Sequence, residues 1–235
     1  MMSIELMTNE LVRVLKDAQL FAHGDNAIPV INAVHLESRD KELIAVGTDR
    51  FVLGVSKTEL DEITAPFAAA LPLRQVKTIL QLAGSCKQAF SKVTIDADEN
   101  VVRVAFSSGE TLTLPAELET GAHRGWLKLL DSTPDDTPSK AMLLNPALLA
   151  KFSRVTGGGQ ARARLHFFGM AKPIRVTIGD SFVGMVMPAR MPDDASVDWE
   201  APDWVKPPPP PVVEKAAPKK AATKPRAKRP VKVAS

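Results

Sequence analysis

The sequence contains a single cysteine, Cys86, among its 235 residues. One cysteine cannot form an internal disulfide, so the chain is not a disulfide-stabilised secreted scaffold. No apolar run approaches the roughly 18–20 residues that a membrane-spanning helix needs. The N-terminus, MMSIELMTNE, has no basic start followed by an apolar stretch, so no signal peptide is expected. These absences predict a cytoplasmic protein without a membrane partner.

Signatures of catalysis are missing as well. The four histidines, His23, His35, His123 and His166, have no metal-ligand spacing with cysteine or with one another. The sequence contains no G-x-S-x-G motif, Walker A loop or G-x-G-x-x-G motif. The glycines at 157–159 follow a predicted helix, so they indicate a helix end rather than a phosphate-binding loop. We therefore expect no enzyme activity, no cofactor and no metal.

Charge is distributed unevenly along the chain. The formal net charge is +3, but residues 206–235 hold nine of the 30 basic residues and one of the 27 acids. That segment therefore carries +8, and the preceding residues carry −5. Its proline run and its Ala, Pro, Lys and Arg content cannot bury enough apolar area to order it, so residues 206–235 are predicted to be a disordered basic tail. The folded part is expected to end near Pro192, with residues 193–205 as a transitional segment.

A short helical pattern followed by three strand-like runs occurs three times before the tail. The helical patterns begin at Thr8, after Pro72 and after Asn145, and we expect them to end near Gly24, Gly84 and Gly157. Thr8 and Asn145 are the predicted N-caps. The strand-like runs cover 34–38, 43–48 and 51–57, then 92–97, 101–107 and 110–114, then 162–168, 174–178 and 182–188. This order predicts an α+β fold whose helices cover one face of antiparallel sheets.

Basic residues recur on the predicted solvent faces of these helices. No acid occurs between Ile63 and Ile95 or between Thr137 and Gly179. Each helix carries a basic pair at spacing i, i+3, although Asp17 dilutes the first pair; the pairs are Arg13 and Lys16, Arg74 and Lys77, and Lys151 and Arg154. The plain interpretation is that these are ordinary solvated helix faces. Their regular repetition favours one positive surface that binds a polyanion through its phosphates.

Four stretches of the sequence together resemble DNA sliding clamps, most closely the β clamp of bacterial DNA polymerase III. The stretch 28–60 resembles that family's Ile-Pro segment and strands ending in Thr-Asp, and LPLRQVKTILQL (71–82) resembles a clamp helix. GAHRGWLKLLDSTP (121–134) is similar to the linker between clamp domains, and FVGMVMPARM (182–191) to the Met-Pro-x-Arg ending. A short chain with a basic tail is typical of a bacteriophage rather than a cellular version.

The resemblance implies a DNA-clamp fold built from repeated helix-plus-meander units. Residues 1–120 would form a clamp-like domain of two units, and residues 121–192 a half or second domain with the third unit. A bacterial clamp chain has six such units and its ring has twelve. Four chains of three units would supply twelve, but an odd number per chain requires a half-domain that another chain completes.

The resemblance also implies two kinds of site. The helix cations named above correspond to positions that line the channel and touch the DNA backbone. The tail would add nonspecific DNA contacts through Lys219, Lys220, Lys224, Arg226, Lys228 and Arg229. The positions that match a pocket for polymerase peptides are Thr48, Leu53, Met185, Met187, Pro188 and Met191. The alternative for Met185 and Met187 is that they are core residues of a strand. Arg50-Phe51-Val52-Leu53 stands where many clamps have Gly-His-Arg-Leu, which puts the pocket's specificity in question.

The predicted function is that of a DNA polymerase processivity factor, a homo-oligomeric ring on duplex DNA that binds a polymerase and a clamp loader. One alternative is a clamp-like interaction protein that forms no ring and binds clamp partners or the host's clamp. A further alternative is a nonspecific DNA-binding protein that acts through its basic tail.

Overall fold

The computed structural model of the chain describes residues 2–62, 67–85, 91–98, 101–115, 117–118, 125–130, 141–157, 162–169 and 171–192. The chain divides into one unit from Met1 to Asp198 and another from Trp199 to Ser235. All described residues lie in the former. The predicted transitional segment and basic tail, with their six candidate DNA-binding residues, lie outside the described residues.

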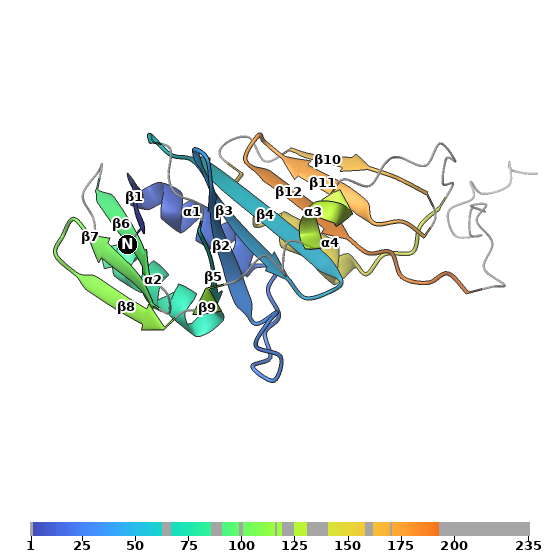
Figure 1. Cartoon of the computed structure of the whole chain (residues 1–235). Coiled ribbons are helices and arrows are strands. Elements are labelled where there is room, and N and C mark those ends of the chain that lie inside the picture. The colour runs from blue at the N-terminus through green and yellow to red at the C-terminus, as the bar shows by residue number, and fades with distance from the viewer. Residues whose placement is uncertain are drawn as a thin grey trace, which may run out of the picture. The chain divides into compact units, whose positions relative to one another are not determined.

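The elements follow the predicted order, with additions (Figure 1). The first unit comprises β1 (Met2–Met7), α1 (Thr8–Gln19), β2 (Ala33–Arg39), β3 (Glu42–Thr48) and β4 (Val52–Glu59). The second unit comprises β5 (Phe67–Pro72), α2 (Leu73–Ser85), β6 (Lys92–Asp98), β7 (Val101–Phe106) and β8 (Thr111–Pro115). The connection that follows contains β9 (Glu117–Leu118) and α3 (Gly125–Leu130). The third unit comprises α4 (Pro146–Phe152), β10 (Ala163–His166), β11 (Ile174–Ile178) and β12 (Phe182–Val186).

The strands form two antiparallel sheets, so the predicted α+β class is confirmed. One sheet has the order β1-β6-β7-β8 and the other the order β10-β11-β12-β4-β3-β2-β5-β9. Strands β1 and β5, which precede their helices, were not predicted. Each leaves its own unit to pair with the other: β1 pairs with β6, and β5 pairs with β2. The first two units are therefore interlocked by an exchange of strands.

The third unit joins the first through an antiparallel pair between β12 and β4. A row of glycines, Gly47, Gly54 and Gly184, crosses β3, β4 and β12 at matching register positions. A Cβ on Gly54 would lie 2.1 Å from the ring of Phe21, and one on Gly47 would lie 2.1 Å from the Ala18 carbonyl oxygen. The glycines thus let the end of α1 approach the sheet closely.

Helices α1 and α4 cover the same face of the larger sheet. Leu11, Val14 and Leu15 of α1 are buried against that sheet and against the β1-β6-β7-β8 sheet. The rings of Phe21, Phe152 and Phe182 meet at centroid separations of 4.9 to 6.2 Å. These rings join the end of α1 to α4 and to β12, which links the first and third units through apolar contact.

A buried carboxylate adds a polar link between the same two units. Asp17 of α1 is fully buried and accepts hydrogen bonds from the Thr156 N–H (2.9 Å), the Thr156 hydroxyl (3.0 Å) and the Gly157 N–H (3.3 Å). It also accepts one from the Ser56 hydroxyl at 3.3 Å. Asp17 was predicted to lie beside the basic pair on the solvent face of the helix, and that prediction was wrong.

The predicted helix ends were correct in part. Asn145 caps α4, since its side chain accepts a hydrogen bond from the Ala147 N–H at 2.9 Å and Pro146 follows it. Thr8, however, is the first residue of α1 and the cap position belongs to Met7. Helix α1 ends at Gln19 rather than near Gly24, because the chain turns after it to place Phe21 in the core.

Candidate functional site

The solvent faces of α1, α2 and α4 carry no free acidic group. The three helices contain two acids, Glu10 and Asp17, both in α1. Asp17 is buried as described above. Glu10 accepts hydrogen bonds from Arg13 (2.8 and 3.0 Å) and from the Thr58 hydroxyl (3.0 Å). Both carboxylates are therefore held within the chain.

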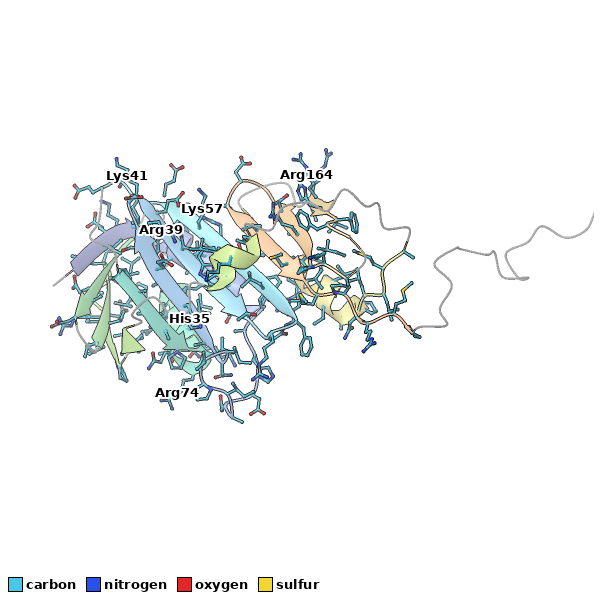
Figure 2. The ribbon with its side chains drawn as sticks, turned by 45° about the vertical axis from the view of Figure 1, so that its right-hand side comes forward. His35, Arg39, Lys41, Lys57, Arg74 and Arg164 are labelled. Atoms are coloured by element: carbon cyan, nitrogen blue, oxygen red, sulfur yellow. The ribbon has the colours of Figure 1, made fainter. Side chains whose placement is uncertain are left out.

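The predicted cations of these helices, of which Arg154 lies two residues past the end of α4, fall into an exposed set and a partly buried set. Lys16, Arg74, Lys77 and Arg154 are exposed, and among the described residues none of the four has an ion-pair partner. Figure 2 shows Arg74 at one edge of the view with its side chain directed outward. The exposed cations lie on the side of the molecule where α1, α2 and α4 lie, because α1 packs against α2 and shares a sheet face with α4.

Arg13 and Lys151, two of the predicted DNA contacts, are partly buried and bonded to other groups of the chain. The Arg13 side chain is 13% exposed, and its guanidinium donates to Glu10, Ser56, Ser181 and the Lys57 carbonyl. Lys151 is 26% exposed and forms an ion pair with Asp49 at 2.7 Å. The predicted i, i+3 pairs are thus split on α1 and at α4, and only Arg74 and Lys77 stay together at the surface.

Arg13 also affects the titration of Glu10. Burial by itself raises the pKa of Glu10, but the hydrogen bonds from Arg13 and Thr58 and the charge of Arg13 outweigh it, and they hold the pKa below its ordinary value of 4.5. Glu10 therefore stays ionised at neutral pH and cancels the charge of Arg13 locally.

The opposite face of the larger sheet carries the residues predicted to form a peptide pocket. Leu53 and Met185 lie directly opposite one another in the β4–β12 pair. They are 5% and 3% exposed and pack in one apolar cluster with Trp126 of α3. Leu127 and Leu130 of the same helix pack against this cluster. Helix α3 therefore covers the centre of the predicted pocket, and Met185 is a core residue.

The remaining predicted pocket residues lie at the rim of this cluster. Met187 is 41% exposed, and its N–H donates to the carbonyl of Phe51, which is 62% exposed. Thr48 is half-buried and its hydroxyl donates to the Val52 carbonyl at 2.8 Å. Pro188 and Met191 are half-buried. Phe51 and the α3 residues were not among the predicted pocket residues, because Phe51 departs from the clamp pattern and the apolar run GWLKLL lies in a segment similar to a linker.

The turn between β3 and β4 departs from ordinary backbone geometry at Arg50. Its φ is +78°, in the left-handed region that favours glycine. The turn is held by Asp49, whose Oδ1 accepts from the Phe51 N–H (3.0 Å) and the Val52 N–H (2.9 Å). Arg50 stands where the clamp resemblance has glycine, so the turn retains a glycine-like conformation without the glycine.

The histidines and acids of the described part of the chain are dispersed or bonded locally. No group of three or more His, Cys, Asp or Glu residues there could hold a metal ion. His35 is buried with its Nε2 3.0 Å from the Val30 carbonyl, and the Nδ1 of His23 accepts from the Asp25 N–H. No described helix is long and apolar enough to cross a bilayer.

Comparison with known proteins identifies others that share this fold. No protein-family model matches the sequence. The β sliding clamp of Rickettsia bellii is 22% identical over 141 residues, which cover 60% of this chain and 36% of that protein. The DNA polymerase III β subunit of Thermotoga maritima superposes with a TM-score of 0.67 at 13% identity, over 82% of this chain and 66% of that one. The sliding clamp of Pseudomonas aeruginosa gives a TM-score of 0.59 at 13% identity, over 87% and 66% of the two chains.

The chain has the fold of a bacterial DNA sliding clamp. It spans about a third of the curated clamp that it matches and just under two thirds of the T. maritima subunit. The predicted resemblance and fold are thus confirmed. These relatives are bacterial, and a bacteriophage origin stays a prediction. In clamp terms, the described residues supply three helix-plus-meander units, in agreement with the sequence analysis.

Proposed function

We propose that this chain is a DNA polymerase processivity factor, a sliding clamp that encircles duplex DNA and tethers a replicative polymerase. It acts by topology and carries out no chemistry, in the cytoplasm of a bacterial cell. The observation that carries the proposal is the exposed positive charge on the side of this clamp fold where α1, α2 and α4 lie. Lys16, Arg74, Lys77 and Arg154 are exposed there, and both helical acids are held internally.

The physics of such a surface suits sliding. Cations that contact phosphates bind DNA without reading its sequence, and the affinity depends on released counterions. Long Lys and Arg side chains on rigid helices can exchange one phosphate for the next. A ring of these helices would hold DNA without fixing its position. Arg13 and Lys151 would contribute less than the sequence predicted, because the internal bonds described above occupy them.

We assign partner binding to the rim of the apolar cluster under α3. Phe51 and Met187 are exposed, joined by a backbone hydrogen bond, and flanked by the half-buried Pro188 and Met191. Exposed aromatic and methionine side chains on a fixed strand end suit an apolar peptide of a polymerase or clamp loader. Phe51→Asp is expected to lower the affinity for such a peptide without unfolding the protein.

One experiment compares helix cations with cations elsewhere. The triple variant Lys16→Glu, Arg74→Glu, Lys77→Glu is compared with Lys41→Glu, Arg103→Glu, Lys172→Glu in the full chain. The control residues are equally exposed but lie in turns or on a strand's solvent face; Lys41 and Arg74 are at opposite edges of the view in Figure 2. The charge change is the same and the tail is unchanged in both.

Binding to a duplex of mixed sequence is measured against salt. The helix variant is expected to lower the slope of log affinity against log salt by about 2–3, from roughly 0.9 per lost phosphate contact. The control variant should stay close to the wild type. Equal losses in the two variants would mean that the helix side has no special role.

A second experiment separates a clamp from the alternative of a tail-driven DNA binder. The protein is incubated with nicked circular DNA, with the loader of its host where one is needed, and unbound protein is removed. A clamp is released when the circle is linearised, because it slides off the free ends. Retention that is indifferent to linearisation would favour the tail-driven binder.

A further inference from the structure

The first two units follow one rule for the strand that precedes a helix. That strand does not join its own meander but pairs with the first meander strand of the other unit, as β1 does with β6 and β5 does with β2. The inward side chains two and four residues before the helix meet inward side chains of that strand. Leu6 lies opposite Val93, and Leu71 lies opposite Val34.

The third unit has the same segment without such a partner. Residues 142–145 directly precede α4, and no sheet of the described residues includes them. Met142 and Leu144, four and two residues before the helix, are the side chains that pack inward, and Leu143 between them is 46% exposed. The alternation is that of β1 and β5.

A backbone bond on one edge of this segment strengthens the equivalence. The outer edge of β5 pairs with β9, which follows the second unit's last strand. In this pair Ala70, three residues before α2, lies opposite Glu117 of β9. In the third unit the Leu143 carbonyl, three residues before α4, accepts from the Ala189 N–H at 2.8 Å. Ala189 likewise follows the unit's last strand. Like β5, residues 142–145 are therefore bonded on one edge to the chain that follows their unit's last strand, and their other edge has no strand partner among the described residues.

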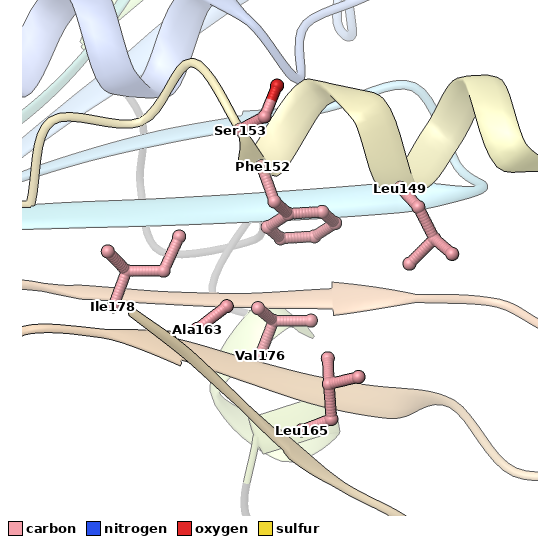
Figure 3. A pocket seen from close by; sticks show the side chains of 7 residues that line it. All are labelled: Leu149, Phe152, Ser153, Ala163, Leu165, Val176 and Ile178. Carbon is pink, nitrogen blue, oxygen red and sulfur yellow. The ribbon is translucent and has the colours of Figure 1, made fainter. Parts of the chain in front are cut away.

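The matching acceptor edge is open as well. Strand β10 ends the larger sheet, and among the described strands none pairs with its outer side. Leu165 of β10 is 45% exposed, whereas Leu36 and Ile95, the inward residues of the corresponding strands, are each 1% exposed. Beside it, α4 and the sheet border an apolar groove of about 360 Å³. Figure 3 shows Leu149 and Phe152 projecting from α4 toward Leu165 and Val176 across this groove.

We propose that a second copy of this chain completes the third unit, through a two-fold exchange of residues 142–145. Each copy's segment pairs with the partner's β10, with Leu144 opposite Ala163 and Met142 opposite Leu165, by the rule of the first two units. The partner's α4 packs beside α4, as α2 packs beside α1. The sheet is thereby continued by one strand, and its exposed edge and groove are covered.

Pairing through this edge does not depend on the exposed helix cations, so the dimer can be tested without DNA. Leu165→Asp places a charge in the exchanged sheet. Val30→Asp is the control, because Val30 is 68% exposed and lies in a turn that lines neither β10 nor the groove. Light scattering on the full chain is expected to give an even number of copies for the wild type and for Val30→Asp, and half that number for Leu165→Asp. A monomeric or odd-numbered wild type, or an unchanged Leu165→Asp assembly, would overturn the proposal.

A cysteine pair tests the register independently of stability. With Cys86 replaced by serine, Leu143→Cys with Arg164→Cys joins outward residues that the register sets opposite one another, within disulfide reach. Oxidation is expected to give a covalent dimer on a non-reducing gel. Leu143→Cys with Arg162→Cys, two residues out of register, should cross-link far less. Equal cross-linking of both pairs, or of neither, would refute the exchange, as would capture of a different protein in place of a second copy.

Discussion

The buried carboxylate of Asp17 gives the sharpest stability prediction for this chain. Its oxygens accept four hydrogen bonds from Ser56, Thr156 and Gly157, two of them from backbone N–H groups, and the residue is 0% exposed. Asp17→Ala removes every acceptor at once. Donors left unpaired in a buried site cost about 1–3 kcal/mol each. The hydroxyls of Ser56 and Thr156 can turn elsewhere, so the buried Gly157 N–H and the partly buried Thr156 N–H dominate the loss.

We therefore expect Asp17→Ala to lower the free energy of unfolding by about 3–5 kcal/mol, a large part of the roughly 5–15 kcal/mol of a typical domain. Urea unfolding followed by circular dichroism should show a midpoint lower by about 2 M, for a slope of 1–3 kcal/mol per molar. Asp17→Asn keeps the volume but turns an NH₂ group toward the same donors, so it should be intermediate.

The link also has a local signature. Thr156 and Gly157 follow α4, so loss of the carboxylate should speed amide exchange in α4 more than in α2. The control is Asp61→Ala, since Asp61 is exposed and its loss is expected to change stability by less than about 0.5 kcal/mol. A midpoint for Asp17→Ala within the range of Asp61→Ala would refute the reasoning.

Three further perturbations have defined directions. Arg50→Gly should stabilise the protein by about 0.5–1 kcal/mol in thermal or urea unfolding, because relief of the left-handed φ exceeds the entropy cost of glycine; a loss of stability would contradict the strain. Gly54→Ala should lower the free energy of unfolding by about 2–3 kcal/mol, because its Cβ meets the Phe21 ring. Gly84→Ala in α2, which has open space around it, should raise it by about 0.5–1 kcal/mol. The melting temperatures of the two variants should therefore shift in opposite directions. Since the pKa of Glu10 is lowered in the folded state, its contribution to stability is present above pH 4.5 and is lost as the pH falls below that value. Glu10→Gln should therefore lose less stability in acid than the wild type does. Parallel curves of unfolding free energy against pH for the two proteins would exclude this role.

Much of the fold could be predicted because its signals are local. The helical pattern that begins at Thr8 predicted α1, and the structure buries its apolar residues Leu11, Val14, Leu15 and Ala18. The Asn-Pro pair predicted the start of α4, and alternating runs predicted the meanders. Strand β5 was not predicted because its FAAALP sequence is rich in alanine, which has little preference for strands. Helix α3 is six residues long, too short for a periodic signal.

The sequence by itself determined the three repeated units, the scarcity of acid around their helices and the separation of a basic tail from an acidic body. Only the tertiary structure decided which charged residues face outward. Arg13 and Asp17 lie on the same helix as Lys16, but Ser56, Ser181 and Thr156, all distant in sequence, turn the first two inward. The same holds for Leu53 and Met185, which α3 covers. Helical and strand periodicity follow from local backbone geometry, whereas hydrogen-bond partners and covering elements depend on long-range contacts that only folding brings together.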